Sequence, residues 1–406
     1  MASADAVREQ VERIAKGTVT LETARELEDR LREGRPLRVK LGADPSAPDI
    51  HLGHAVALAK LRAFQDLGHT VLFIVGDFTA RIGDPSGRSK TRPRLSREEV
   101  ERNAETYTRQ VFTILDPKRT EVLFNSRWLD RLSFAELVRL ASKTTVAQML
   151  QRDDYAKRYA AGTPISLHEF LYPLAQAYDS IEVRADVEVG GTDQTFNLLL
   201  GREMQRAYGQ RPQVVLTMPL LEGLDGVEKM SKSLGNHIGI AEPPFEIYGK
   251  VMSIPDALMP RYFGLLTELD FEALRKEIPH PRDLKMRLAR GIVARFHGEG
   301  AAASAEENFA VAFGKGGVPS DGDWVKVVRL SPGEYPLIAL LRDSGLAATG
   351  SEARRKIREG AVRIDGRKVS DEGEKLSVGA AGEERILRLG RRKFARIVSE
   401  RAPGGA

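Results

Sequence analysis

The chain has 406 residues, 42% of them hydrophobic, which is enough for roughly two to four domains with ordinary cores. It has no cysteine, which excludes a disulfide framework, a thiolate zinc site and a cysteine nucleophile. The N-terminal stretch is charged, and no run approaches the roughly 20 apolar residues of a membrane span, so the sequence predicts a cytoplasmic protein. The net charge is +5, and the arginine-rich stretch 385–401 indicates a nucleic-acid partner.

Apolar strands alternate with helices in the first half of the chain. Strands are predicted at 37–43, 70–77, 121–125, 186–191 and 213–217, and helices at 51–68, 95–115 and 192–208. Ser96 and Glu99 form a capping box at the start of the second helix. The alternation predicts an α/β fold, a doubly wound parallel-sheet nucleotide-binding domain at 1–240 with a helical insertion at about 126–180.

The second half of the chain has a different pattern. Residues 241–318 are predicted to be helical, 319–334 to be a linker, and 335–400 to form a small α+β module. In that module Ser351 is placed to cap a basic helix, and an Asp-Gly turn predicts a hairpin. The basic residues of this helix and hairpin suit RNA phosphates, although a solvated basic helix is the alternative: Arg354, Arg355, Lys356, Arg358, Arg367 and Lys368.

Two short motifs indicate a triphosphate site. The first, HLGH, places His51 and His54 at the N-terminus of the predicted helix that follows the first strand and its loop, where anions bind well. Gly53 between them leaves room for a flat ring, and Asp44 lies in the preceding turn. A metal site or plain surface histidines are the alternatives, but neither an HExxH motif nor a cysteine supplies a third ligand.

The second motif, KMSKS, follows the last predicted strand of the sheet. Lys229 and Lys232 lie in a loop flanked by glycines, where they could close over a triphosphate and neutralise the leaving pyrophosphate. A solvated basic turn is the alternative. Together, HLGH and KMSKS resemble the two signature motifs of the class I aminoacyl-tRNA synthetases, which implies ATP-dependent formation of an aminoacyl-adenylate. The other motif residues that would then line the ATP site are Met230, Ser231 and Ser233.

A helix near the end of the insertion carries a polar stripe. Tyr172, Gln176 and Asp179 share one face of an otherwise apolar helix and need a polar partner, either a buried network or a bound amino acid. Asp193 and Gln194 follow a strand, at the edge of the sheet where ligands bind. These residues resemble the bacterial tyrosyl-tRNA synthetase family over nearly the full length of the chain.

The resemblance assigns a role to each matching residue. Asp179 would accept the substrate hydroxyl. The ammonium group would be held by Tyr172, Gln176 and Asp84, with Gln194 near the activated carboxyl group. Asp193 would contact ribose, while Gly42 and Asp44 would line the adenylate site. Asn125 and Trp128 fall in a family segment after the third strand. Beyond Asp84, the Gly-Asp-Pro turn continues to Arg88 and Arg92.

One position departs from the family. Many relatives have a tyrosine where this chain has Lys40, and that tyrosine helps to read the substrate phenol. Another group, or water, must supply that contact here. Relatives with KLG in place of YCG form a branch of the family.

The resemblance also implies substrates and partners. The expected substrates are ATP with Mg²⁺ on its phosphates, L-tyrosine and tRNA(Tyr). No structural metal is expected, and a homodimer is expected through the insertion. The rivals are a tryptophanyl enzyme, a small-molecule adenylyltransferase and an inert synthetase-like RNA-binding factor. A phenol suits Asp179 better than an indole does, and intact HLGH and KMSKS motifs argue against an inert protein.

Overall fold

The computed structural model describes residues 3–45, 49–84, 96–313, 325–379, 382–390 and 393–400. The chain forms two compact units. The first comprises Met1–Ala241 and Ala257–Glu272, and the second comprises Glu242–Asp256 and Ala273–Ala406. The helical region expected at 241–318 is therefore shared between the two units. No helix among the described residues has the length and hydropathy needed to cross a bilayer.

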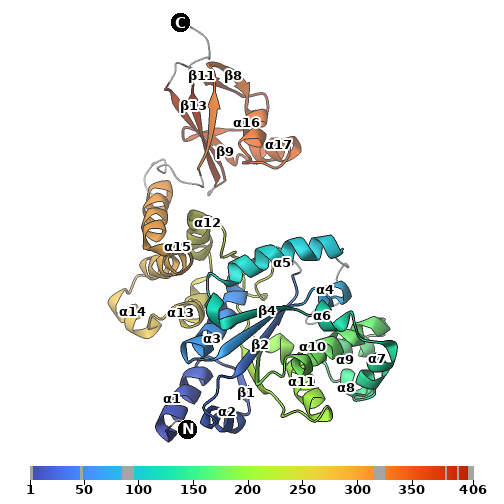
Figure 1. The fold of residues 1–406 in the computed structure, drawn as a ribbon. Coiled ribbons are helices and arrows are strands. Elements are labelled where there is room, and N and C mark those ends of the chain that lie inside the picture. Colours follow the sequence, from blue (N-terminus) through green and yellow to red (C-terminus); the bar gives the residue numbers. More distant parts are fainter. Residues whose placement is uncertain are drawn as a thin grey trace. The chain divides into compact units, whose positions relative to one another are not determined.

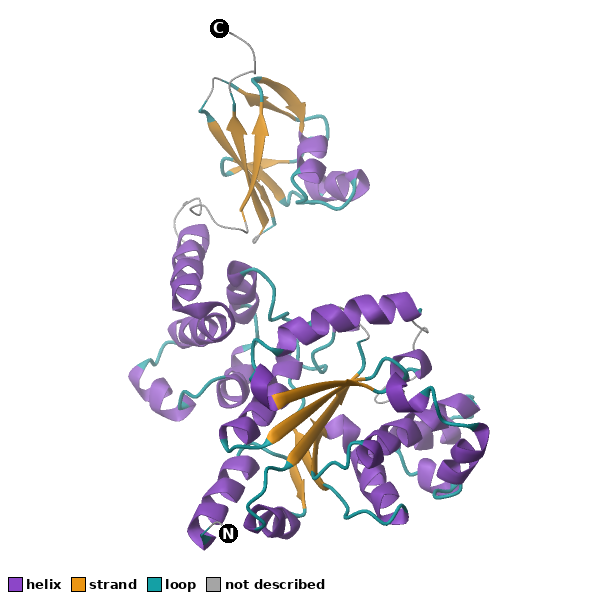
Figure 2. Ribbon diagram, in the orientation of Figure 1, coloured by secondary structure: helices purple, strands orange, loops and turns teal. Residues whose placement is uncertain are grey.

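The first unit is built around a six-stranded sheet with the order β1-β6-β5-β2-β3-β4 (Figures 1 and 2). Its strands are β1 (Thr20–Glu22), β2 (Arg38–Ala43), β3 (Thr70–Val75), β4 (Thr120–Phe124), β5 (Val187–Gly191) and β6 (Val214–Met218). Five strands are parallel, as predicted, but the short β1 pairs antiparallel with β6. The doubly wound parallel sheet is therefore confirmed for the predicted strands, and β1 is an edge strand that the sequence analysis did not predict.

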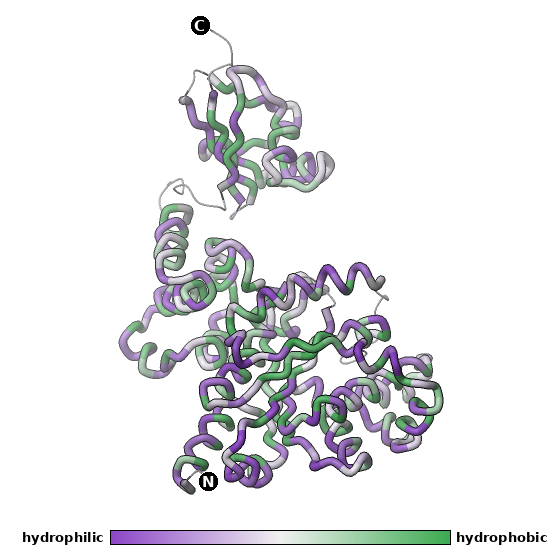
Figure 3. The backbone as a smooth tube through the Cα atoms, viewed as in Figure 1, coloured by the Kyte–Doolittle hydropathy of each residue, from purple (hydrophilic) through white to green (hydrophobic). Residues whose placement is uncertain are grey.

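Helices flank the sheet (Figure 2). Those outside the insertion are α1 (Ala4–Ala15), α2 (Ala24–Arg32), α3 (Leu52–Asp66), α4 (Thr79–Ile82), α5 (Arg97–Val111), α11 (Thr195–Ala207) and α13 (Met259–Leu266). The insertion contains α6 (Ser126–Leu129), α7 (Phe134–Ala141), α8 (Val146–Met149), α9 (Asp153–Ala160) and α10 (Leu171–Glu182). The capping box of Ser96 and Glu99 is confirmed at α5. Figure 3 shows the hydrophobic residues concentrated along the central strands, as burial on both faces of a sheet requires.

The strand order places a topological switch point at β2. The chain runs from β2 outward to β3 and β4, and then returns to β5 and β6 on the other side of β2. The loops after β2 and β5 therefore diverge and leave a crevice at the carboxyl ends of these strands. This is the edge of the sheet at which the sequence motifs lie.

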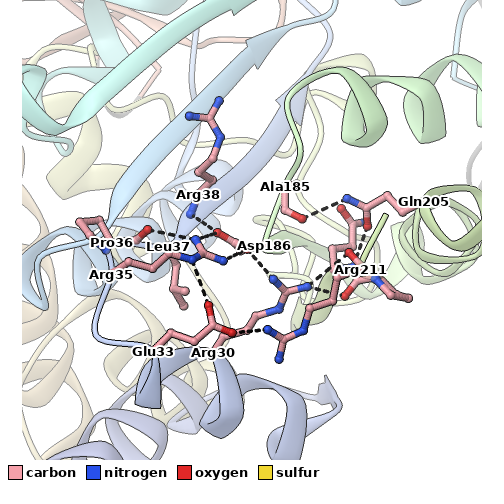
Figure 4. Close-up of polar contacts among 12 residues, drawn as sticks. Arg30, Glu33, Arg35, Pro36, Leu37, Arg38, Ala185, Asp186, Gln205 and Arg211 are labelled. Carbon is pink, nitrogen blue, oxygen red and sulfur yellow. Dashed lines mark hydrogen bonds and ion pairs between the residues drawn. The ribbon is translucent and has the colours of Figure 1, made fainter. Parts of the chain in front are cut away.

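At the opposite edge, a buried aspartate ties the amino ends of β2 and β5 together (Figure 4). Asp186 accepts hydrogen bonds from the Arg38 backbone N–H at 2.9 Å and from the Arg35 guanidinium at 2.6 and 2.7 Å. Arg30 of α2 forms a further buried ion pair with it. Burial alone would raise the pKa of Asp186, but the bonds from Arg35 and Arg38 and the nearby arginine charges lower the pKa below its ordinary value.

Asp186→Ala is expected to destabilise the first unit by about 3–5 kcal/mol, because buried Arg30 would lose its counter-charge. Since the pKa of Asp186 is lowered in the fold, its stabilising contribution is present at neutral pH and is lost as the pH falls below its ordinary value of 3.8. Urea unfolding measures both effects. Asp66→Ala removes exposed ion pairs with Arg62 and Arg13 and should cost under about 1 kcal/mol. Equal costs for the two variants would contradict the role of Asp186.

The second unit begins with helices and ends in a small module. Its helices are α12 (Pro244–Met252), α15 (Pro281–Phe313, turned at Gly298), α16 (Leu337–Asp343) and α17 (Gly350–Arg358), and α14 (Phe271–Glu277) spans the unit boundary. A five-stranded sheet has the order β10-β9-β12-β13-β7, and a two-stranded one pairs β11 with β8. These strands are β7 (Val325–Leu330), β8 (Gly333–Pro336), β9 (Val362–Ile364), β10 (Arg367–Val369), β11 (Lys375–Val378), β12 (Glu384–Leu389) and β13 (Lys393–Ser399).

Two predictions for the module need correction. Residues 325–330 were placed in a linker, but they form β7, which pairs in parallel with β13. The helix α17 is capped by Thr349, whose hydroxyl accepts a hydrogen bond from the Glu352 N–H at 3.1 Å, and not by Ser351, which lies inside the helix. The hairpin of β9 and β10 is confirmed, with positive φ at both Asp365 and Gly366.

Candidate active site

The crevice at the switch point holds a cavity of about 520 Å³ within the first unit. It brings HLGH and KMSKS together, although they lie far apart in the sequence. Every residue predicted for catalysis, ATP or tyrosine lines it: Gly42, Asp44, His51, Gly53, His54, Asp84, Asn125, Tyr172, Gln176, Asp179, Asp193, Gln194, Lys229, Met230, Ser231, Lys232 and Ser233. A single site therefore contains both phosphate-binding motifs and the polar stripe of α10.

The two imidazoles of HLGH lie close together at the start of α3, with their ring planes tilted by 33°. His51 is the N-cap residue, its backbone N–H donates to His54 Nδ1 at 3.3 Å, and the ring centroids are 3.8 Å apart. A Cβ at Gly53 would lie 3.0 Å from the His51 ring, so any larger residue would push that ring out of its position. Burial lowers the pKa of His51, and His54, His237 and the two KMSKS lysines lower it further. His51 is therefore neutral at physiological pH.

The KMSKS loop lines the same cavity as these imidazoles, and buried contacts hold its backbone in place. Met230 is buried, and the Ser231 N–H donates to the side chain of buried Asn236 at 2.7 Å. Lys229 pairs with Asp193 at 2.7 Å, and Lys232 pairs with Asp49 at 2.7 Å. Both lysines thus pair with carboxylates that line the cavity, and the phosphates of a bound triphosphate would compete with these carboxylates for the lysines.

Sequence reasoning missed Asp49. The carboxylate also accepts a hydrogen bond from Gln110 at 3.3 Å. Burial would raise the pKa of Asp49, but Lys232 outweighs that effect, and the pKa is lowered. An acidic residue two positions before the helix N-cap was the available signal, since such residues favour helix N-termini.

The far end of the cavity contains a buried carboxylate. Asp179 is 3% exposed, with its Oδ1 2.8 Å from Trp128 Nε1 and its Oδ2 3.3 Å from Asn125 Nδ2. Burial raises the pKa of Asp179 to about 7, against the lowering effects of Lys40 and of the two hydrogen bonds. A carboxylate with two fixed donors and unused lone pairs can accept one more hydrogen bond from a ligand.

A second group of polar side chains lies between the carboxylate and the phosphate motifs. Tyr172 donates to Asp44 Oδ2 at 3.0 Å, and Thr79 donates to Asp44 Oδ1 at 2.6 Å. The predicted roles of Tyr172 and Asp44 were separate, but the structure joins them. A Cβ at Gly76 would collide with Asp44 and Thr79, so a glycine is required for this contact.

The remaining predicted residues, Gln176, Gln194 and Asp84, belong to one hydrogen-bond network. Asn197 Nδ2 donates to Gln176 Oε1 at 3.0 Å and to Gln194 Oε1 at 2.9 Å, and Gln194 donates to Asp84 at 3.0 Å. Arg152 bonds Asn197 at 3.2 Å and lies 3.5 Å from Asp84. Sequence reasoning missed Asn197 and Arg152, since only the fold reveals that α11 and the insertion meet here. The result is a carboxylate and amide surface suited to an ammonium group.

In the C-terminal module, the residues predicted to bind RNA lie on α17 and β10. Several form exposed ion pairs, such as Lys356 with Glu359 at 2.8 Å and Arg358 with Glu372 at 2.9 Å. Exposed pairs of this kind contribute little to stability, so phosphates can displace them. Arg88, Arg92, Arg391, Arg392 and Arg401 lie outside the described residues.

Comparisons with known proteins agree with this geometry. The family model for tRNA synthetases class I (W and Y) matches residues 32–314, and the model for the S4 domain matches residues 336–381. The tyrosine–tRNA ligase of Thermotoga maritima is 54% identical over 96% of this chain and 97% of its own, and that of Shewanella oneidensis is 53% identical over 95% and 97%.

Solved structures show the same fold. A truncated mitochondrial tyrosyl-tRNA synthetase from Aspergillus nidulans has a TM-score of 0.63 at 23% identity, covering 75% of this chain and 95% of its own. The enzyme from Archaeoglobus fulgidus, complexed with L-tyrosine, has a TM-score of 0.60 at 24% identity, covering 74% and 99%. The chain belongs to the tryptophan and tyrosine family of class I tRNA synthetases, followed by an S4 domain. Within that family, the curated relatives that match over nearly their full length are tyrosine–tRNA ligases.

Proposed function

We propose that this chain is an ATP-dependent tyrosine–tRNA ligase. It joins L-tyrosine to ATP, giving tyrosyl-adenylate and pyrophosphate, and then transfers tyrosine to the terminal adenosine of tRNA(Tyr). One observation carries the proposal: HLGH and KMSKS line a single cavity that extends to the buried carboxylate of Asp179. Phosphate chemistry and phenol recognition are thus available in one site.

In the first step a tyrosine carboxylate oxygen attacks the α-phosphorus, and the bond to the bridging oxygen of pyrophosphate breaks. The nucleophile is already an anion, so no general base is needed, and catalysis rests on positioning and charge stabilisation. Lys229 and Lys232 leave Asp193 and Asp49 to neutralise the charge on the pyrophosphate. The imidazoles of His51 and His54 donate to phosphoryl oxygens, with Ser231 and Ser233 beside them.

The remaining cavity residues position the two substrates. Asp193, once Lys229 has left it, contacts the ribose. Gly42 and Gly53 leave room for the adenylate, and buried Met230 lines the cavity beneath it. Gln176 and Asp84, with the joined pair of Tyr172 and Asp44, hold the tyrosine ammonium group. Gln194 lies beside the reacting carboxyl group, and Asn125 supports Asp179.

Magnesium would arrive with ATP and would supply positive charge beside its phosphates. The described residues contain no cluster of three histidine or carboxylate groups that would hold a metal ion. The acidic residues nearest the lysines, Asp49 and Asp193, are each ion-paired.

The second substrate is a folded RNA. The phosphates of tRNA(Tyr) would bind α17 and the β9–β10 hairpin through Arg354, Arg355, Lys356, Arg358, Arg367 and Lys368. A ribose hydroxyl of the terminal adenosine then attacks the carbonyl carbon of the adenylate, and AMP leaves. We place the protein in the cytoplasm, as expected for a chain similar to the tyrosine–tRNA ligases of bacteria such as Thermotoga maritima.

ATP–pyrophosphate exchange with each amino acid in turn tests the function. Exchange with tyrosine supports the ligase. Exchange with tryptophan would assign the other specificity of the family, and no exchange with any amino acid would favour an inert RNA-binding factor.

His54→Ala is expected to lower kcat for adenylate formation on the order of a hundredfold, with little change in the KM for tyrosine, because the imidazole acts mainly on the charge of the transition state. Single-turnover adenylate formation measures the effect. His280→Ala, a change in the second unit, is the matched histidine control and should keep the wild-type rate. A large rise in KM at unchanged kcat would contradict the proposed role of His54.

The insertion also supports a homodimer. It presents large exposed apolar side chains, led by Phe134 at 82% and Leu167 at 83% exposed, with Val138, Val146 and Tyr159. Such a concentration on one insertion is typical of an interface. Sedimentation should give twice the chain mass, and Phe134→Asp with Leu167→Asp should give monomers, whereas Val327→Asp in the C-terminal module should not. A monomeric wild type would refute the dimer.

A further inference from the structure

We infer, on the basis of the tyrosine ligase activity proposed above, that Lys40 does not read the substrate hydroxyl. Lys40 is instead a positioning residue, whose buried ion pair with Glu188 fixes Gln176 and α10. The hydroxyl is read by Asp179 alone, so that it donates a hydrogen bond and accepts none from the protein.

The first argument is that the donors of Lys40 are all used. An ammonium group has three N–H donors. Lys40 Nζ lies 2.9 Å from Glu188 Oε1, 2.7 Å from Ser180 Oγ and 2.9 Å from the Gln176 carbonyl oxygen. Lys40 is fully buried, and it is not among the described residues that line the cavity. It therefore has no N–H group to offer a ligand without breaking a buried bond.

The second argument is that the ion pair continues into the amino-acid site. Glu188 Oε1 also accepts from Gln176 Nε2 at 3.2 Å, which fixes the amide so that its oxygen faces Asn197. Glu188 Oε2 accepts from Ser180 Oγ at 3.0 Å and from Gln213. Lys40 and Glu188 thus hold Gln176 through both its backbone and its side chain.

The close approach of α11 supports this arrangement. Gly201 lies in the interior of α11, where glycine costs about 1 kcal/mol relative to alanine. A Cβ there would lie 2.8 Å from Gln213 Nε2 and 3.1 Å from Ser180 Oγ. The helix therefore has no side chain where it passes over the network, and the network fills that space.

The third argument concerns the phenol end. Trp128 has one N–H, which Asp179 accepts. The two N–H groups of Asn125 Nδ2 are directed to Asp179 and to Thr79, and the Thr79 hydroxyl donates to Asp44. Among the described residues around Asp179, the donors of Lys40, Trp128, Asn125 and Thr79 are thus committed to protein acceptors. A bound phenol therefore finds an acceptor in Asp179 and no uncommitted donor among these four residues.

Wild-type enzyme tests the reading of the hydroxyl directly. In pyrophosphate exchange, 4-aminophenylalanine keeps an N–H donor at the para position, whereas 4-fluorophenylalanine and 4-methoxyphenylalanine have none. We expect the amino compound to be activated at least tenfold better than the fluoro and methoxy compounds, which should match phenylalanine. A fluoro or methoxy compound that equals or exceeds the amino compound would overturn the inference.

The variant Lys40→Met with Glu188→Gln tests positioning. Lys40→Met alone leaves a buried carboxylate unpaired and is expected to fold poorly. The double variant removes both charges, whose effects on the pKa of Asp179 oppose each other. We expect the KM for tyrosine to rise about tenfold or more, as for a weakened ammonium site, with kcat and the tyrosine-to-phenylalanine ratio of kcat/KM changed less than threefold.

The outcomes separate the inference from the proposed function. A fall of tenfold or more in the tyrosine-to-phenylalanine ratio would show that Lys40 reads the hydroxyl and would refute the inference alone. An unchanged KM would refute the positioning role. If the double variant does not fold, the analogue series on the wild type still decides how the hydroxyl is read. Failure of the wild type to exchange with tyrosine would refute the ligase proposal itself.

Discussion

Replacing Asp179 by alanine is expected to lower kcat/KM for tyrosine activation by about a hundredfold or more, which corresponds to about 3 kcal/mol for a lost charged hydrogen bond. The loss has two parts. The substrate phenol would enter a buried site without its acceptor, and Trp128 and Asn125 would each keep an N–H without its carboxylate partner. Tyrosine–tRNA ligases are the standard example of discrimination by such a buried polar group.

Pyrophosphate exchange over a range of tyrosine concentrations measures this loss. Asp130→Ala, an exposed aspartate on the same insertion, is the matched control and should behave as wild type. A kcat/KM for Asp179→Ala within threefold of wild type would contradict the assignment of Asp179.

The pH dependence of tyrosine binding follows from the same residue. Burial raises the pKa of Asp179 to about 7, so near neutral pH a substantial fraction of the ligand-free protein has this carboxyl protonated. The ionised form is the stronger acceptor, and the KM for tyrosine should therefore fall as the pH rises from about 6 to 8. Asp179→Asn should lose this dependence, because an amide does not titrate. A dependence that persists in the asparagine variant would belong to another group.

Removing residues 325–406 is expected to abolish tRNA charging while leaving tyrosine-dependent pyrophosphate exchange within about threefold of wild type. The described residues that line the cavity all belong to the first unit, whereas the residues expected to bind phosphates lie on α17 and β10. A protein that neutralises several phosphates loses orders of magnitude in affinity without its basic residues. The deletion begins at 325 because β7 pairs with β13 and would be left without its neighbour by a cut at 335.

Charging of tRNA(Tyr) and exchange are measured on the same preparation, so a misfolded truncation would show itself by losing both. The full-length variant Arg354→Ala with Arg358→Ala supplies a second measurement. It should raise the KM for tRNA and reduce the salt dependence of binding, with exchange unchanged. Arg342→Ala, an exposed arginine of α16 that pairs with its neighbour Asp343, is its control. Charging that survives the deletion would refute the RNA-binding role of the module.

Much of the fold was predictable because continuous apolar runs mark buried strands and regularly spaced apolar residues mark helices. The buried strand β3 and the capped helix α5 were confirmed close to their predicted bounds. Two strands that the sequence did not reveal are defined by partners distant in the sequence. The strand β1 has three residues, and the pairing with β6 alone makes it a strand. The strand β7 lies in a region that resembles a linker, and the pairing with β13 defines it.

The candidate site likewise contains residues that the sequence predicted and residues that it did not. The residues in recognisable motifs meet in one cavity, because the carboxyl ends of parallel strands share one edge of the sheet. The residues that hold them were not predictable. Asn197 lies in α11 and Arg152 lies directly before α9, and nothing local marks either residue. Lys40 was recognisable as unusual, but its three bonds depend on where α10 and β5 lie.

The pairing of β1 with β6 has a consequence for how the protein is made. The chain emerges from the ribosome with Thr20–Glu22 first, and the partner strand Val214–Met218 follows almost 200 residues later. Until then the first strand has no neighbour, and the sheet ends in an open edge beside β5. Closure of the catalytic unit therefore waits for nearly all of that unit to be synthesised, and a nascent chain stalled before Val214 leaves unpaired strands for chaperones to shield.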